Sequence, residues 1–308
     1  MKWPLALAVL LVTAAPAPAP EPIARSVFAS ADPDAELIDG ETWVFPTNAP
    51  SDRLLAWSSP DLAHWKQRGE LLRLKDISWI KADGARQHYL WAPDMVRADG
   101  RWLLYYSVGP QNPTPSRLGV AVCAAPQGPC TDSGKPLLTG GAGFEAIDPM
   151  VYVDPKSATR YLYAGGSAGA RLRVFELAPD MVTTLREIPV PQPVNFTEGV
   201  FMHERGGVYY LSYSHGGWRD ASYSVHYSTA PSPTGPWRYR GPILASDSLF
   251  KGPGHHSFVV EGDRTLIVYH RWEGQSGDGP YSGDRRIAIG VVEYGPDGAI
   301  LPIRMAHR

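Results

Sequence analysis

Apolar and polar residues alternate in short runs along most of this chain, and one such pattern recurs five times. Each copy is a turn followed by an aromatic-rich alternating run, and the copies begin at Asp39 (DGETWVFPTN), Asp99 (DGRWLLYYSVG), Ser157 (SATRYLYAGG), Arg205 (RGGVYYLSYS) and Gly262 (GDRTLIVYHR). The successive starts lie 60, 58, 48 and 57 residues apart. Alternation with a period of two, bounded by turn residues, predicts β-strands, and repetition at a spacing of this size is typical of a repeat architecture.

A second pair of strand-like runs follows each copy, so each unit holds about four strands, the content of one propeller blade. Helical periodicity is scarce, and 31 Gly and 30 Pro are scattered through the chain. We therefore predict an all-β fold, a five-bladed β-propeller. A large β-sandwich would also give short strands, but it would not repeat at this interval. Whether residues 21–30 supply the strand that closes the ring stays open at this stage.

Three acidic residues in strand-like apolar settings are the first candidates for chemistry: Asp32 in ASADPDAELIDG, Asp148 in FEAIDPMVYVD and Glu198 in NFTEGVFMHE. Each precedes or opens the first strand of a different predicted blade, and those strands line the central channel of a propeller. A carboxyl group is costly to desolvate without a partner, which favours chemistry over packing. The alternative is that the Asp-Pro pairs only start turns, with Asp34 or Asp154 as the relevant neighbours.

Composition narrows the choice of partners. The chain has 308 residues, 44% of them apolar, with 10 Trp and 15 Tyr, so it can bury a large core and needs no cofactor or partner in order to fold. Its formal net charge is −2 and it contains no long basic run. Nucleic acid and membrane surfaces are therefore not expected partners, and we expect a monomer.

The N-terminus predicts export. Met1-Lys2 is followed by an apolar run too short to span a membrane and then by PAPAPEP, which is the pattern of a secretory signal peptide. We assign residues 1–20 to this peptide, with a mature start between Ala15 and Glu21, and residues 21–308 to a single catalytic propeller. The protein is then secreted or periplasmic.

The two cysteines agree with an oxidising compartment. Cys123 and Cys130 enclose a Pro/Gly-rich loop in VCAAPQGPC, which lets the two sulfurs meet, and we expect one small disulfide that joins a hairpin. The alternative is two free thiols. Metal binding by this pair alone is not expected, because a structural zinc site needs about four ligands.

Eight segments in one order resemble glycoside hydrolase family 43, which comprises exported five-bladed propellers that cleave arabinose- and xylose-containing polysaccharides. The resemblance covers the chain from about Phe28 to Ile303. Its segments are ADPDAELIDG, SSPDLAHWK, WAPD, AIDPMVYVD, FTEGVFMHERGGVYYLSYS, TAPSPTGPW, GPGHHS and RRIAIGVVEYGPDG. It implies that Asp32 is the general base, that Asp148 is the carboxylate that modulates the acid and orients substrate, and that Glu198 is the general acid.

The chemistry of an inverting glycosidase suits these roles. Such an enzyme needs one protonated carboxyl group to protonate the leaving oxygen and one carboxylate to activate water, roughly 6.5–9.5 Å apart. A third carboxylate near the acid favours its protonated form by repulsion between like charges.

The resemblance also implies further site residues. Trp91 in WAPD is similar to the family's sugar-platform tryptophan, the alternative being a core aromatic residue, and Phe196 beside Glu198 is a candidate pocket wall. His255 in GPGHHS corresponds to a histidine in the axial channel that binds calcium or another ion through waters, the alternative being a buried histidine and an empty channel. Arg286 matches an arginine that reaches substrate, although neighbouring Arg285 is an alternative.

We therefore expect an inverting exo-acting α-L-arabinofuranosidase that requires no cofactor, with Ca²⁺ in the central channel as an option and an oligo- or polysaccharide as substrate. The alternatives are a β-xylosidase, an endo-1,5-α-L-arabinanase and a non-catalytic sugar-binding propeller. The chain ends at Arg308, without the appended β-sandwich of some xylosidase relatives, which favours arabinose. A fructan-cleaving enzyme would carry a Trp-x-Asn-Asp-Pro-Asn-Gly start, and a sialidase would carry Ser-x-Asp-x-Gly-x-Thr-Trp boxes; neither is present.

Overall fold

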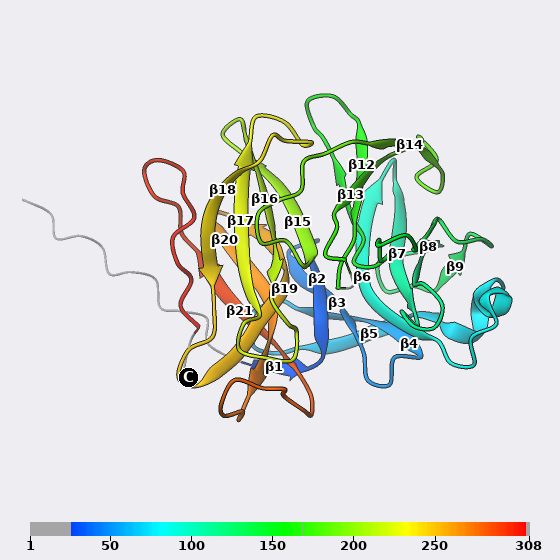
Figure 1. Cartoon of the computed structure of the whole chain (residues 1–308), viewed down its shortest axis with the longest axis horizontal. Helices are drawn as coiled ribbons and strands as arrows, with labels where there is room; N and C mark the ends of the chain where they lie inside the picture. The colour runs from blue at the N-terminus through cyan, green and yellow to red at the C-terminus, as the bar shows by residue number, and fades with distance from the viewer. Residues whose placement is uncertain (1–25, 168, 306–308) are drawn as a thin grey trace, which may run out of the picture.

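The computed structural model describes residues 26–167 and 169–305, and in these residues five antiparallel sheets are arranged around a common axis (Figure 1). The predicted five-bladed β-propeller is confirmed. The predicted signal peptide, its cleavage point and the domain boundary at residue 21 lie outside the described residues.

The first four blades follow one another along the chain, each with its innermost strand first. Blade 1 comprises β2 (Ala31–Ile38), β3 (Glu41–Thr47), β4 (Arg53–Ser59) and β5 (Lys66–Arg73). Blade 2 comprises β6 (Tyr89–Ala98), β7 (Arg101–Gly109), β8 (Arg117–Cys123), β9 (Cys130–Asp132) and β10 (Leu138–Thr139), the last two both paired with β8. Blade 3 comprises β11 (Met150–Val153), β12 (Arg160–Ala164), β13 (Arg173–Leu177) and β14 (Thr184–Ile188); blade 4 comprises β15 (Glu198–Arg205), β16 (Val208–His215), β17 (Ser224–Ala230) and β18 (Arg238–Leu244).

Blade 5 is completed by the beginning of the described chain. Its strands are β19 (Phe250–Glu261), β20 (Arg264–Glu273) and β21 (Arg286–Val292), and its outermost strand is β1 (Ser26–Ala29), which pairs antiparallel with β21. The two ends of the ring are therefore joined by backbone hydrogen bonds, and residues 26–29 supply the closing strand that the sequence left undecided.

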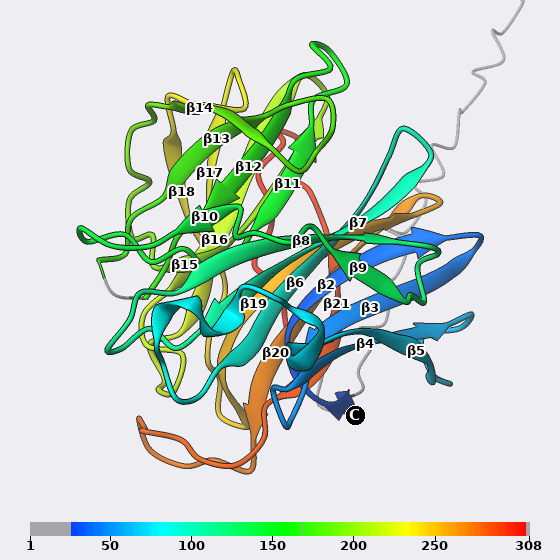
Figure 2. The same ribbon diagram turned by 90° about the vertical axis from the view of Figure 1, so that its right-hand side faces the viewer.

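The core is divided among the spaces between neighbouring blades, and each of the five junctions has its own cluster of buried apolar side chains. Leu104 and Tyr106 pack from blade 2 against Phe45 and Leu54 of blade 1, for example. The aromatic-rich runs found in the sequence are the second strands of the blades, and their side chains fill these junctions. The innermost strands β2, β6 and β19 lie near one another in the middle of the molecule (Figure 2).

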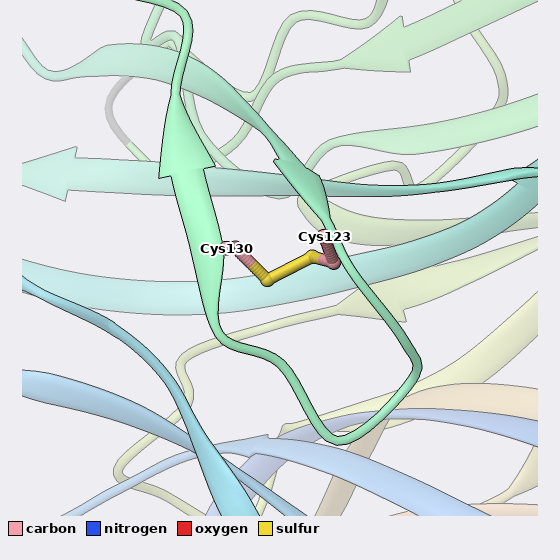
Figure 3. Close-up of a disulfide and its surroundings, with 2 residues drawn as sticks. All are labelled: Cys123 and Cys130. Carbon is pink, nitrogen blue, oxygen red and sulfur yellow. A yellow bond between two sulfur atoms is a disulfide. The ribbon is translucent and has the colours of Figure 1, made fainter.

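Helical structure among the described residues is limited to two short 3-10 helices, Leu74–Asp76 and Ile80–Asp83, between β5 and β6. None of the helices found in residues 26–167 and 169–305 has the length and apolar character needed to span a bilayer. Cys123 at the end of β8 and Cys130 at the start of β9 are joined by a disulfide (Figure 3), which closes the short loop between these strands.

Candidate active site

The side chains of the site come from one repeated backbone feature near the start of the innermost strands. In every blade one residue there has a positive φ: Asp32 (47°), Ala92 (43°), Asp148 (53°), Gly199 (60°) and His255 (42°). In four of the blades the pairing with the second strand shifts register at this point, as in a β-bulge. A bulge bends the strand and turns a side chain away from its regular direction, and left-handed backbone in non-glycine residues is concentrated at functional sites.

Hydrogen bonds from the preceding blade hold this unusual backbone in place. In each blade the amide of the positive-φ residue donates to a side chain of the blade before it: Asp32 to His270 Nδ1 (3.1 Å), Ala92 to Thr47 Oγ1 (2.7 Å), Asp148 to Ser107 Oγ (2.9 Å), Gly199 to Asp148 Oδ2 (3.1 Å) and His255 to Ser214 Oγ (2.8 Å). Five blades are thus joined in a ring of hydrogen bonds, four of them buried, which holds the backbone of the site in place.

These bulges surround a pocket of about 360 Å³. The three predicted acids, Asp32, Asp148 and Glu198, line it together although they come from blades 1, 3 and 4. Trp91 from blade 2 and His255 from blade 5 line it as well, with eight further residues that include Arg285, Ser167 and Trp218. The structure therefore brings the three acids to one place, in the size range of small-molecule sites.

Asp32 is held as an ion. Its Oδ1 accepts a hydrogen bond of 2.7 Å from Nη1 of Arg285, and Nδ1 of His270 lies 3.3 Å from the same oxygen. Burial alone would raise the pKa of Asp32, but Arg285 and His270 outweigh it, so this pKa is held well below its usual value. Asp32 is therefore ionised at neutral pH, as a base that activates water must be.

Glu198 is surrounded by hydrogen-bond donors. The hydroxyl of Tyr223 donates to its Oε1 at 2.8 Å, while the hydroxyl and the amide of Ser167 donate to its Oε2 at 2.5 and 3.2 Å. Gly166 lies so close that a Cβ there would be 2.6 Å from the Cβ of Glu198. The carboxyl group is therefore fixed in one orientation toward the pocket.

Asp148 differs from Asp32 in its charge environment. Burial raises its pKa well above the usual value, and the nearby carboxyl groups of Glu198 and Asp32 raise it further, against the hydrogen bond from the Gly199 amide. The pocket thus combines an ionised carboxylate, Asp32, with a carboxyl group, Asp148, that retains its proton more readily.

His255 lies between two of the acids. Its Nδ1 is 3.7 Å from Oδ1 of Asp32 and 3.5 Å from Oδ2 of Asp148, and burial lowers the pKa of the imidazole. Across residues 26–167 and 169–305, no group of three or more His, Cys, Asp or Glu side chains is placed to hold a metal ion. Ca²⁺ takes roughly six to eight oxygen ligands, so these side chains alone do not form a calcium site. An ion held through waters at His255 stays a prediction.

Of the predicted binding residues Trp91 and Phe196, only Trp91 lines the pocket. Phe196 is buried, packs edge-on against Tyr213 at 5.8 Å in the core between blades 3 and 4, and is not among the residues that line the pocket. Its expected place in the pocket wall is therefore wrong. Trp91 does line the pocket, and its ring stacks on Tyr89 at 5.4 Å with an interplanar angle of 7°.

The arginine of the site is Arg285 and not Arg286. Arg286 opens β21, and its guanidinium bonds to Ser26 Oγ and lies 3.7 Å from Glu273, next to the outermost strand of blade 5. Arg285 precedes β21 and points into the pocket. Neighbouring residues of an extended chain face opposite sides, so a choice between them cannot be made from the sequence pattern alone.

Four further residues shape the site and were not predicted from the sequence. Tyr223, His270 and Ser167 contact the acids, and Trp218 lines the pocket. The rings of Tyr223 and His270 stack on each other, with 5.7 Å between their centres and an interplanar angle of 8°; Tyr223 contacts Glu198 and His270 contacts Asp32. Both follow the apolar alternation of ordinary strand residues, so the sequence carries no signal that separates them from the core.

A propeller in which three acids converge, one of them bonded to an arginine, has the site of a glycosidase. Comparison with known proteins identifies the family. Residues 23–300 match the profile of glycosyl hydrolases family 43. A β-D-galactofuranosidase of Aspergillus niger is 35% identical over 78% of this chain and 73% of its own, and a xylosidase/arabinosidase of Humicola insolens is 27% identical over 91% and 98%. The crystal structure of a family 43 β-xylosidase/α-arabinofuranosidase from a compost metagenome, in complex with xylotriose, has 26% identity and a TM-score of 0.72, covering 91% of this chain and 96% of that one.

The chain therefore belongs to glycoside hydrolase family 43, and it is an inverting glycoside hydrolase. The family resemblance inferred from the eight sequence segments is confirmed.

Proposed function

We propose that this protein is an α-L-arabinofuranosidase that releases terminal arabinofuranosyl units from arabinose-containing plant polysaccharides or oligosaccharides. The convergence of Asp32, Asp148 and Glu198 on one small pocket carries the proposal. Support for furanoside substrates comes from relatives, because an arabinoxylan arabinofuranohydrolase and a β-D-galactofuranosidase are among them.

Each acid has a distinct role in the proposed mechanism. Asp32, ionised and held by Arg285, takes a proton from the water that attacks the anomeric carbon. Glu198, oriented by Tyr223 and Ser167, gives a proton to the leaving oxygen. Asp148 accepts a hydrogen bond from the amide of Gly199, the residue that follows Glu198, and so positions the acid and the substrate. Inversion follows because the water attacks from the side opposite the leaving group.

Three further activities are supported by particular relatives. The Humicola insolens relative is named for both xylosidase and arabinosidase activity, which favours β-xylosides as a second substrate. The Aspergillus niger relative favours β-D-galactofuranosides. An endo-acting arabinanase is supported by a probable arabinan endo-1,5-α-L-arabinosidase of Aspergillus clavatus that is 27% identical over 83% of this chain.

Hydrolysis of four aryl glycosides tests the specificity: α-L-arabinofuranoside, β-D-xyloside, β-D-galactofuranoside and α-L-arabinopyranoside. The proposal requires the highest kcat/KM on the arabinofuranoside. A higher value on the xyloside or the galactofuranoside would overturn it in favour of that specificity, and release of internal fragments from linear arabinan would overturn exo action.

Leaving-group dependence tests the roles of the acids. Glu198→Ala should lose most activity on substrates with poor leaving groups and keep it on a dinitrophenyl glycoside, which needs no acid. Asp32→Ala should lose activity on both, because the water remains unactivated. Glu187→Ala, on the outer strand β14, is the matched control and should behave like the unmodified enzyme. Equal losses of Glu198→Ala on all leaving groups would refute the role of Glu198.

We also propose that the protein is exported. The signal-like residues 1–20 support this, and so does the disulfide between Cys123 and Cys130, because disulfides persist in oxidising compartments. Expression of the full chain in a bacterium, fractionation and N-terminal sequencing test it. A product outside the cytoplasm that begins between Ala15 and Glu21 is expected, and a cytoplasmic product that begins at Met1 or Lys2 would contradict export.

A further inference from the structure

Two fully buried rings, Tyr223 and His270, form a stacked pair next to the catalytic pocket. Tyr223 directly precedes β17 of blade 4, whereas His270 belongs to β20 of blade 5. The pair therefore spans the junction between two blades. Neither residue is among those that line the pocket, so neither is placed to touch a bound substrate.

The two rings are bonded to different acids of the site. The hydroxyl of Tyr223 donates to Oε1 of Glu198 at 2.8 Å, and Nδ1 of His270 accepts from the amide of Asp32 at 3.1 Å. In the proposed mechanism these two carboxyl groups are the acid and the base. Groups that stand far apart in the sequence are thus supported by neighbouring faces of one stack.

The backbone of blade 5 fixes the position of this stack. His270 pairs with Gly254 of β19 on one side and with Ile287 of β21 on the other. A Cβ at Gly254 would be 2.1 Å from the ring of Tyr223, so this ring lies directly on the β19 backbone beside His270. The phenol can take this place only because residue 254 has no side chain and because the imidazole offers it a flat face.

His270 is suited to accept a hydrogen bond from Asp32. Burial lowers the pKa of His270 to about 4, and the guanidinium of Arg285, whose Nη1 lies 3.5 Å from Nε2, also lowers it, so the imidazole is neutral at neutral pH. A neutral imidazole has one nitrogen free to accept. The amide that it receives belongs to a residue with a φ of 47°, a conformation that persists only where the surrounding structure imposes it.

We propose that His270 is a positioning residue that holds the base and the acid in place at the same time. Its Nδ1 fixes the left-handed backbone of Asp32, and its ring face fixes the phenol of Tyr223, which in turn orients Glu198. This inference rests on the roles proposed above for Asp32 and Glu198, and it adds that the two are supported by one side chain.

Two substitutions separate the two contacts of His270. His270→Asn keeps an oxygen acceptor near the place of Nδ1 but removes the ring on which Tyr223 stacks. His270→Phe keeps a ring but leaves the Asp32 amide without an acceptor. Both variants are assayed on two glycosides of the sugar that the enzyme cleaves best: a dinitrophenyl glycoside, which needs no acid, and a methoxyphenyl glycoside, which does.

The two variants should differ in their dependence on the leaving group. His270→Asn should lower kcat about tenfold on the methoxyphenyl glycoside and less than about threefold on the dinitrophenyl glycoside, because only the acid loses its support. His270→Phe should lower kcat about tenfold on both, because both need the water that Asp32 activates. KM should change little, because His270 does not line the pocket. The ratio of the two kcat values does not depend on how much of a preparation is folded.

His226 provides the matched controls. It is a buried histidine of blade 4 that stacks on Tyr239 at 5.9 Å and 19°, and its ring nitrogens bond to Tyr239 and Ser224. His226→Asn and His226→Phe should leave the ratio of the two kcat values unchanged. Equal losses of His270→Asn on both glycosides, or a loss of His270→Phe confined to the methoxyphenyl glycoside, would overturn the proposal.

A double variant tests whether the two rings act as one unit. On the methoxyphenyl glycoside, His270→Asn combined with Tyr223→Phe should lose about as much as the larger of the two single losses. A loss equal to their product would show that the rings act separately and would overturn the shared support. Failure of the acid assignment would look different, because Glu198→Ala would then show no dependence on the leaving group.

Discussion

Tyr223 and Glu198 are joined by a hydrogen bond of 2.8 Å from the phenol hydroxyl to Oε1. The ring of Tyr223 is fixed independently of this bond, because it stacks on His270 and lies against Gly254, where a Cβ would be 2.1 Å from the ring. Removal of the hydroxyl therefore leaves the ring in place and isolates the effect of the hydrogen bond on the acid.

Tyr223→Phe is expected to lower kcat by about tenfold or more with little change in KM, because a hydrogen bond to an ionisable group contributes roughly 1.5–3 kcal/mol. Steady-state kinetics on an aryl glycoside with a poor leaving group measures this. Tyr105→Phe is the control: its hydroxyl donates to the Met181 carbonyl at 2.6 Å, outside the pocket, so kcat should stay the same. A kcat unaffected in Tyr223→Phe would show that this bond does not orient the acid.

Arg285→Ala should move the acid limb of the pH profile of kcat/KM upward. Arg285 is the largest contribution that lowers the pKa of Asp32 against the effect of burial, so without it this pKa rises and the base is protonated at higher pH. An opposite charge at this distance shifts a pKa by about 1–3 units, so we expect a displacement of at least about one pH unit.

Arg286→Ala is the matched control for that experiment. Its guanidinium contacts Ser26 and Glu273, outside the pocket, so the pH profile should keep its position. A displacement of the acid limb in Arg286→Ala but not in Arg285→Ala would reverse the assignment of the site arginine.

The fold could be predicted because its strongest signal is local. The inner hairpins carry period-two alternation, turn residues and aromatic side chains within about twenty residues, and these determine strands without knowledge of the rest of the chain. The closing strand Ser26–Ala29 is different. It is only four residues long. It forms a strand because it pairs with the edge of β21, which lies more than 250 residues later in the chain.

The convergence of Asp32, Asp148 and Glu198 on one pocket could be predicted because each stands in a distinctive segment at or just before the start of an innermost strand. The residues that surround these acids could not be predicted from the sequence. The side chains of Arg285 and Arg286 point to opposite sides of the chain. Which of them points into the pocket depends on the residue at which the pairing of β21 begins. Phe196 is close to Glu198 in sequence, but it precedes the strand, and its ring turns into the core.

Loss of the disulfide should reduce stability without reducing activity. The disulfide joins Cys123 and Cys130, which are seven positions apart in the sequence, at the edge of blade 2. In the chain-entropy account, closure of so short a loop contributes about 2–3 kcal/mol. The double variant Cys123→Ser/Cys130→Ser should therefore show a lower Tm with unchanged kcat/KM at 25 °C. Reduction by dithiothreitol should lower the Tm of the unmodified protein and leave that of the variant unchanged.

Asp34→Asn should stabilise the protein at neutral pH and not at acid pH. Asp34 is buried two residues after Asp32, where its Oδ2 accepts from the Met95 amide at 2.8 Å and its Oδ1 from Ser257 at 3.2 Å. Burial raises the pKa of Asp34 to about 6. The folded protein therefore binds this proton more tightly than the unfolded chain does, and as pH rises from about 4 to above 6 the carboxylate destabilises the fold increasingly.

An asparagine can accept the same amide hydrogen bond and does not ionise. The gain in unfolding free energy of Asp34→Asn should be near zero at pH 4 and reach up to about 3 kcal/mol at pH 7, because a difference of about two pKa units corresponds to that energy. Urea unfolding at both pH values measures it. Asp263→Asn, in the exposed β19–β20 turn, is the control and should give the same small change at both pH values. A stabilisation by Asp34→Asn that is equal at pH 4 and pH 7 would show that Asp34 does not titrate between them, since only ionisation of the buried carboxyl group makes the difference depend on pH.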